Sequence, residues 1–280
     1  MDFVFKQVAR THVVSGQAEL SQRYARLQEI SGIMTAIKSL ALIETKKLAR
    51  FIERQRLALL NVEAAAADFV NFFSIQRYDA TQPAILIVIG SERGFCGNFN
   101  ERVIETLNAL PTIRSSPVQL VVVGSRLVAK LTERSDIIAT LEGPTVTEET
   151  PAVMNRVMDA LRSASGTALF VLAHNAEGEP LLKQIFPYEP TPNRNFTNPP
   201  RLQLPPSEFF AEMLDQYLLS VLYGLFYESL ASESHERLAR MEQALNRLDE
   251  TIANLTLKRN AMRQEKIIEE IEMILSSNFV

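Results

Sequence analysis

The stretch ERLARMEQALNRLDETIANL, residues 236–255, has the most regular periodicity in the chain. Its large apolar side chains recur at alternating intervals of three and four residues, at Leu238, Met241, Leu245, Leu248, Ile252 and Leu255. This spacing is typical of the a and d positions of a coiled coil, which form one apolar stripe along a helix. Met262 continues the stripe after an interruption at Arg259. The stretch therefore predicts a long helix that buries one face against a second helix.

A matching stripe near the N-terminus supplies the predicted partner. Its apolar residues are spaced by three and four in the same way, at Leu27, Ile30, Met34, Ile37 and Ala41, and the phase passes through Glu44 to Leu48 and Phe51. Neither helix is expected to be stable alone, because most helical stability in proteins comes from packing an apolar face. We therefore expect the two ends of the chain to pair as an antiparallel coiled coil.

The distribution of proline divides the chain into three parts. All thirteen prolines lie between Pro83 and Pro206. Proline interrupts helices, so the sequences outside this interval are free to form long ones. We predict an N-terminal helix within residues 1–78, a globular domain over 79–206 and a C-terminal helix within 207–280. Ser207 is a candidate N-cap for the last helix, and residues 188–206 are expected to form the loop that leads to it.

The central part alternates between strand-like and helix-like segments. Continuous apolar runs suited to strands buried on both faces occur at residues 84–89, 120–123 and 168–172. Helix-like segments occur at residues 100–107, 126–134 and 150–163. This alternation favours a Rossmann-like α/β domain with a parallel sheet. The predicted fold class is thus α/β plus coiled coil, with the α/β domain inserted between the two terminal helices.

Composition excludes several classes of protein. A net charge of −4 gives no indication of nucleic-acid binding. No segment contains the roughly 20 apolar residues of a membrane helix, and the N-terminus lacks the pattern of a secretory signal, so we expect no direct membrane insertion. Cys96 is the only cysteine, which rules out an intrachain disulfide and suits a reduced compartment.

No catalytic, cofactor-binding or metal-binding residue is predicted. The segment SERGFCGNFN, residues 91–100, contains Gly94 and Gly97 but matches neither phosphate-binding fingerprint, so we interpret it as a structural turn. Cys96 has no recognisable base nearby in the sequence, and a lone cysteine is more often a small buried residue. His174 follows the third predicted strand and is interpreted as an ordinary loop histidine. No zinc or calcium motif is present.

Three segments of the chain resemble the gamma subunit of F-type ATP synthases. SERGFCGNFN resembles the turn Ser-Asp-Arg-Gly-Leu-Cys-Gly-Gly-Phe-Asn of that family, with Glu92, Phe95 and Asn98 as departures. ESLASESHERLARM, residues 228–241, and ANLTLKRNAMRQEKIIEEI, residues 253–271, resemble two of its C-terminal signatures. AIKSLA, residues 36–41, is similar to Ala-Met-Lys-Met-Val-Ala, although the two lysines that precede it in the family are absent. These departures indicate a divergent or alternate-type member.

The resemblance implies a rotary central stalk and not an enzyme in its own right. Its partners would be the alpha and beta subunits arranged as a hexamer, the epsilon subunit and the membrane ring of c subunits. Rotation of that ring would turn the shaft and drive the catalytic beta sites through different affinities. The location implied is the cytoplasmic face of the inner (plasma) membrane, as a peripheral part of the complex.

The resemblance also assigns expected roles to individual residues. It implies contacts with a beta subunit by Arg263, Gln264, Glu270, Ile37 and Arg237. It implies a structural role in the turn for Arg93, Gly94, Gly97 and Asn100. The apolar end of the last helix would act as the bearing of the shaft.

Two other classes of protein remain open at this stage. The first is a non-rotary coiled-coil scaffold or binding protein with an α/β head. The second is a small α/β enzyme with helical arms, which is disfavoured because no nucleophile–base pair or phosphate loop is visible.

Overall fold

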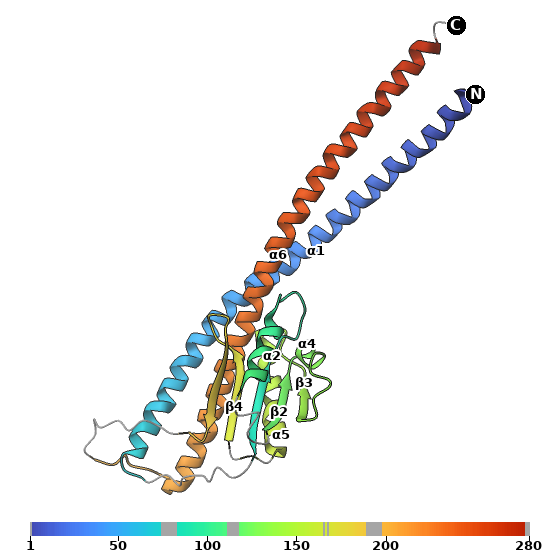
Figure 1. The fold of residues 1–280 in the computed structure, drawn as a ribbon. Coiled ribbons are helices and arrows are strands. Elements are labelled where there is room, and N and C mark those ends of the chain that lie inside the picture. Colours follow the sequence, from blue (N-terminus) through green and yellow to red (C-terminus); the bar gives the residue numbers. More distant parts are fainter. Residues whose placement is uncertain are drawn as a thin grey trace. The chain divides into compact units, whose positions relative to one another are not determined.

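The computed structural model describes residues 2–73, 83–110, 118–164, 166, 168–188 and 198–277, with side chains from residue 18 to residue 275. The long helices α1 (Asp2–Val70) and α6 (Pro206–Ser277) are the first and last elements (Figure 1). The chain packs as two units, Met1–Leu40 with Ala239–Val280, and Ala41–Leu238. The division into residues 1–78, 79–206 and 207–280 stays a prediction.

In the first unit, helices α1 and α6 pair in antiparallel orientation. Lys38 of α1 forms a 3.0 Å ion pair with Glu242 of α6. Further along, the guanidinium of Arg259 lies 4.5 Å from the centre of the Tyr24 ring. Residue numbers fall on one helix as they rise on the other, so the helices run in opposite directions. Arg259, which interrupts the apolar stripe, thus covers an aromatic ring through a cation–π contact.

The predicted stripe of α6 faces inward along its whole length. Met241 is 2% exposed and Leu255 is 7% exposed, and the other predicted stripe residues are half-buried. The stripe of α1 follows the prediction less closely. Leu27 and Met34 are half-buried and Ala41 and Leu48 are buried, but Ile30 is 45% exposed and the next residue, Ser31, is half-buried instead. A straight helix of 3.6 residues per turn drifts against a 3.5-residue repeat, which accounts for such one-residue offsets.

The second unit contains a five-stranded sheet in the order β3-β2-β1-β4-β5. Its strands are β1 (Ala84–Ile89), β2 (Val118–Val123), β3 (Ile137–Leu141), β4 (Ala168–His174) and β5 (Pro180–Phe186). The first four are parallel, and Ile87 of β1 is in register with Val121 of β2 and with Val171 of β4. The fifth strand is antiparallel to β4. The sheet is therefore mixed: the predicted parallel arrangement holds for β1 to β4, and the edge strand β5 is antiparallel.

The helices of this unit cover both faces of the sheet. They are α2 (Phe99–Ala109), the single-turn α4 (Ser125–Val128) and α5 (Thr150–Ser163), which is preceded by the 3₁₀ turn η1 (Thr147–Glu149). The segment 126–134, expected to be one helix, forms only the short α4. Strand β3 follows it directly and was not predicted, since its burial alternates and it is only half-covered at the edge of the sheet.

Helix α6 is part of the core of the α/β domain. Alternate residues of β1 point to opposite faces. On one face, Ile85 and Ile87 pack in a cluster with α5 and with the α6 residues Tyr217, Val221, Leu222, Leu225 and Phe226. On the other face, Leu86 and Val88 pack with α2. Because α6 fills one face of the sheet, the helix and the domain must fold together.

The apolar stripe is predicted to stabilise the coiled coil of the first unit. Met241→Ala should lower the free energy of unfolding by about 2–5 kcal/mol, because it leaves a cavity in the stripe. The matched control is Leu257→Ala, at a position that is 69% exposed on the same helix. Hydrogen exchange of residues 239–260 reports the loss. Equal exchange in the two variants would contradict the pairing.

Candidate functional site

The turn between β1 and α2 is held by a buried amide. The Oδ1 atom of Asn100 accepts a 2.9 Å hydrogen bond from the Ser91 N–H, and its Nδ2 atom donates to the Ser91 hydroxyl at 2.8 Å. Gly97 has a φ of 59°, which an L side chain rarely adopts. The Asn100 side chain thus holds the turn by bonding to Ser91, and Gly97 allows the backbone conformation that the turn needs. The Arg93 side chain is exposed.

A buried ion pair joins this turn to helix α6. Glu233 is 4% exposed and Arg237, one turn later, is 8% exposed. The guanidinium of Arg237 donates to the carboxylate of Glu233 through Nη2 and to the carbonyl of Gly94 through Nε at 3.3 Å. The Cys96 thiol of the same turn also donates to the Glu233 carboxylate. The turn therefore binds α6 by directional, charge-assisted hydrogen bonds.

The pKa shifts at this ion pair and at the neighbouring Cys96 indicate a structural role and not a catalytic one. Burial raises the pKa of Glu233 above its ordinary value of 4.5, and the charge of Arg237 opposes that rise. The Sγ atom of Cys96 lies 3.7 Å from the Glu233 carboxylate. Burial, together with that carboxylate, raises the pKa of the thiol to about 11. Cys96 is therefore protonated at neutral pH, and the thiolate needed for a nucleophile is not formed.

His174 at the end of β4 is a core residue and not a loop residue as expected. Its ring is fully buried and stacks on Phe99 at a centroid distance of 3.7 Å. Neither ring nitrogen has a hydrogen-bond partner among the residues that the structure describes. Burial, aided by the charge of Arg102, lowers the pKa of His174 to about 3. A neutral ring packed in this way contributes to the core.

The residues expected to contact a beta subunit fall in both units. Arg263, Gln264 and Glu270 are exposed on α6 in the first unit, where Lys266 lies 4.0 Å from the Glu270 carboxylate. Ile37 is half-buried on α1 in the same unit. Arg237 lies in the second unit, and its guanidinium is engaged within the chain. Contacts of all five residues with a partner stay predictions.

Sequence reasoning missed the carboxylates that connect these elements. Glu233 was read only as part of a family signature, and Glu44 only as a lapse in the apolar stripe. In the structure, Glu44 accepts hydrogen bonds from the N–H and hydroxyl of Thr147, at 3.2 Å and 2.9 Å. A charged residue at a stripe position was the available signal, because such a residue needs a partner when it is buried.

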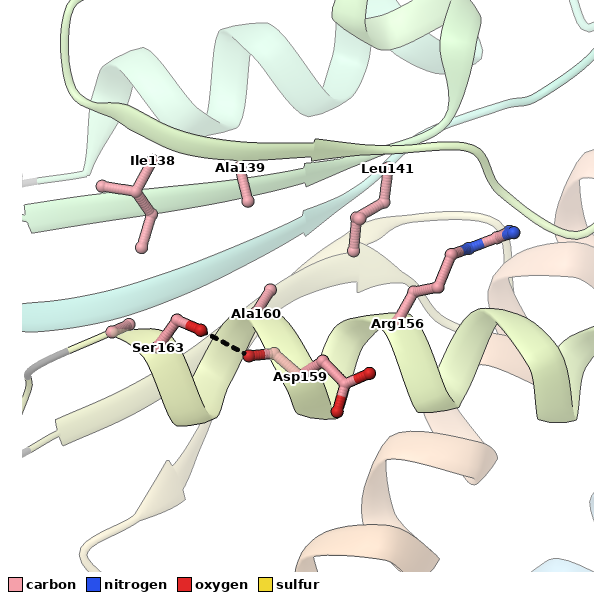
Figure 2. Close-up of a pocket in the computed structure, with 8 residues that line it drawn as sticks. Ile138, Ala139, Leu141, Arg156, Asp159, Ala160 and Ser163 are labelled. Atoms are coloured by element: carbon pink, nitrogen blue, oxygen red, sulfur yellow. Dashed lines mark hydrogen bonds between the residues drawn. The ribbon is translucent and has the colours of Figure 1, made fainter.

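The side chains that line a pocket between β3 and α5 are not arranged for catalysis. Ile138, Ala139 and Leu141 of the strand lie opposite Ala160 of the helix in a space of about 480 Å³ (Figure 2). Its polar lining is engaged locally. The Ser163 hydroxyl donates to the backbone carbonyl of Asp159, and Arg156 donates to the carbonyl of Glu142.

The described part of the chain lacks two further kinds of feature. No group of three or more His, Cys, Asp or Glu side chains there is placed to hold a metal ion. None of its helices combines the length and apolarity that a membrane crossing requires.

The Glu233–Arg237 pair leads to a prediction about stability. Arg237→Ala should lower the free energy of unfolding by about 3–5 kcal/mol, since it leaves a buried carboxylate without its partner. Arg240→Ala, at an exposed position one turn further on, is the control. The double substitution Glu233→Met with Arg237→Met should cost less than Arg237→Ala. Chemical denaturation checks the order, and a harmless Arg237→Ala would contradict the buried pair.

The buried imidazole leads to a prediction about pH. Because the folded pKa of His174 is about 3 and its ordinary value is 6.5, the unfolded chain binds the proton more readily below pH 6.5. Its contribution to stability is thus present above pH 6.5 and is lost as pH falls towards 3, by up to about 1.4 kcal/mol per pH unit. His174→Phe keeps the stack and should flatten this loss in denaturation curves. An unchanged acid slope would refute the assignment.

Comparisons with known proteins agree with this architecture. The family model described as ATP synthase matches residues 16–278. The ATP synthase gamma chain of Bdellovibrio bacteriovorus is 26% identical over 287 residues, covering 92% of this chain and 97% of that one. The ATP synthase gamma chain of Rickettsia felis is 23% identical, covering 94% of this chain and 100% of the other.

Solved structures show the same fold at low identity. A chain of the Euglena gracilis mitochondrial ATP synthase rotor aligns with a TM-score of 0.63 at 12% identity, covering 90% of this chain and 99% of that chain. A chain of the Tetrahymena thermophila central stalk and c-ring aligns with a TM-score of 0.53 at 18% identity, covering 76% and 99%. With the family model matching almost the entire sequence, the chain belongs to the ATP synthase gamma-chain family.

Proposed function

We propose that this chain is the rotating central stalk of an F-type ATP synthase or ATPase. Its partners are the alpha and beta subunits, the epsilon subunit and the membrane ring of c subunits. The chain itself carries out no chemistry. It transmits rotation between the ring and the catalytic sites of the beta subunits, as a peripheral component at the cytoplasmic face of the membrane.

The observation that carries this proposal is that two helices of 69 and 72 residues are both built into one α/β domain. Helix α6 fills one face of the sheet, and Leu48 of α1 is fully buried against Tyr227, Leu230 and Ala231 of α6. A domain fixed to both helices can turn them as one body. A helix at 1.5 Å per residue reaches roughly 100 Å, enough to act at a distance from the domain.

The paired helices present suitable groups for differential contacts. Arg263 and Gln264 are exposed neighbours on α6, with donors and acceptors available to a partner. The large apolar residues near the end of the same helix are also exposed, among them Ile267 at 45%, Ile268 at 55% and Ile271 at 50%. These residues are spaced by three and four along α6 and so share one side of the helix. A shaft that presents them on one side favours different states of three surrounding sites as it turns, which is a coupling free energy between rotation and nucleotide affinity.

A scaffold or binding protein with the same fold is the remaining alternative. The rate of ATP turnover by the assembled complex distinguishes a rotor from a scaffold, because substitutions in a passive scaffold are not expected to change that rate.

The polar pair of α6 is predicted to act in coupling. In a complex co-purified with alpha and beta subunits, Arg263→Ala with Gln264→Ala should reduce ATP hydrolysis and synthesis several-fold, because each lost hydrogen bond to a partner is worth about 1 kcal/mol. The isolated variant should fold normally, as circular dichroism can verify.

The matched control removes two other exposed polar side chains of α6, by Arg247→Ala with Lys258→Ala. Rates equal to the unmodified complex in the double Arg263/Gln264 variant would refute this role. Failure of the unmodified chain to co-purify with alpha and beta subunits would refute the proposed function itself.

A further inference from the structure

One segment of α6 buries polar groups as well as apolar ones. Between the apolar residues that cover the sheet and the coiled-coil stripe, α6 buries Ser229, Ser232, Glu233, Ser234 and Arg237. Apolar contacts are non-directional and tolerate sliding, whereas hydrogen bonds fix angle and distance. We call these five residues the polar collar. Its hydrogen bonds fix the orientation of the domain around the helix, which apolar contacts alone do poorly.

The connections from the polar collar pass through three carboxylates. Glu233 of α6 accepts from the Cys96 thiol in the turn after β1, and its ion-pair partner Arg237 donates to the Gly94 carbonyl of the same turn at 3.3 Å. The Glu92 carboxylate in turn accepts from the N–H of Ser125 at 2.8 Å, from its hydroxyl at 2.6 Å, and from the N–H of Gly143 at 2.7 Å. The turn is thereby tied to the starts of the segments that follow β2 and β3.

The third carboxylate brings the connections to helix α1. Glu44 accepts from the N–H and hydroxyl of Thr147, four residues beyond Gly143 in the same loop. Lys47 of α1 adds ion pairs to Glu44 at 3.1 Å and to Glu148 at 2.7 Å. The two helices also contact each other directly, because Leu48 of α1 packs on Leu230 and Ala231 of α6. The connections therefore form a circuit that runs from α6 through the turn and the loop to α1 and back to α6. All these residues belong to the second unit.

We propose that Glu233, Glu92 and Glu44 form a carboxylate relay that locks both long helices to the carboxyl edge of the sheet and carries torque between them. This inference rests on the proposed function. The three residues are positioning residues, since they act through the turn and the loop that they bind. Each carboxylate–amide bond is of the charge-assisted kind, about twice as strong as a neutral one.

The chain supplies a control that separates the relay from ordinary loop stabilisation. Glu149 accepts from the N–H and hydroxyl of Thr145, both at 2.7 Å, so it makes the same kind of bond in the same loop. It spans only four residues of that loop, however, and joins no helix to the sheet. Glu149→Ala thus removes an equivalent bond without opening the circuit.

The first experiment tests the relay physically, by hydrogen exchange of the full chain. Glu92→Ala should speed exchange of the Ser125 and Gly143 amides about tenfold or more, and Glu44→Ala should do the same for Thr147, the factor that one charge-assisted bond supplies. Glu92→Gln and Glu44→Gln keep an acceptor oxygen of the same reach and should lie closer to the unmodified chain. Unchanged exchange in both alanine variants would overturn the relay.

The second experiment tests its role, in the membrane complex reconstituted into vesicles. ATP-driven membrane potential, read with a potential-sensitive dye, is compared with ATP hydrolysis in the same vesicles. The Glu44→Ala, Glu92→Ala double variant should assemble and hydrolyse ATP but generate at least about twofold less potential per ATP, because torque is lost where the domain slips against the helices. Glu149→Ala should match the unmodified complex.

The two experiments distinguish the possible failures. Faster exchange with an unchanged ratio of potential to hydrolysis would mean that the carboxylates stabilise the fold without carrying torque, and the inference would fall. If the double alanine variant does not assemble, each single alanine variant gives the same ratio measurement. If the unmodified chain drives no pumping in any complex, the proposed function fails, and the exchange result alone decides whether the relay exists.

Discussion

The apolar stripe of α6 cannot be buried without a second helix, and this requirement governs the rest of the molecule. A single helix with one apolar face is marginal in water, so residues 238–262 need a partner of comparable length. Residues 18–40 of α1 meet that need in the first unit, where Met241 and Leu255 are almost fully buried. The chain must therefore return its C-terminal end alongside its N-terminal end. Everything between them becomes an insertion, which is why the α/β domain sits in the middle of the sequence.

Helix α6 changes partners along its length, and its side chains change accordingly. The large apolar residues Tyr217, Val221, Leu222, Leu225 and Phe226 pack against one face of the sheet. The next segment buries polar residues, among them Glu233 and Arg237, and Arg237 binds the backbone of the turn after β1. The stripe from Leu238 onward faces α1. One uninterrupted helix thus belongs to a globular core, a hydrogen-bonded collar and a coiled coil.

The parts that could be predicted from the sequence are those governed by local periodicity. The α6 stripe, strand β1 and helix α5 follow from spacing and apolar runs, and their bounds or burial match closely. Strand β3 was missed because half-covered edge strands lack a continuous apolar run. The Arg237–Gly94 bond and the Glu44–Thr147 bond were missed because their partners lie 143 and 103 residues apart in sequence. Polar contacts between residues so far apart produce no periodic pattern in the sequence. The charge of Glu44 at a stripe position was the one indication of such a contact.

Direct observation of rotation tests the account most sharply. Cys96 is buried and is the only cysteine, so in a Cys96→Ser background a single cysteine at Arg162, which is exposed on α5, labels the α/β domain specifically. A bead attached there, on a complex immobilised through its alpha and beta subunits, should turn in one direction when ATP is added. A complex that hydrolyses ATP while the bead shows no directed rotation would contradict the proposal that this chain is a rotor.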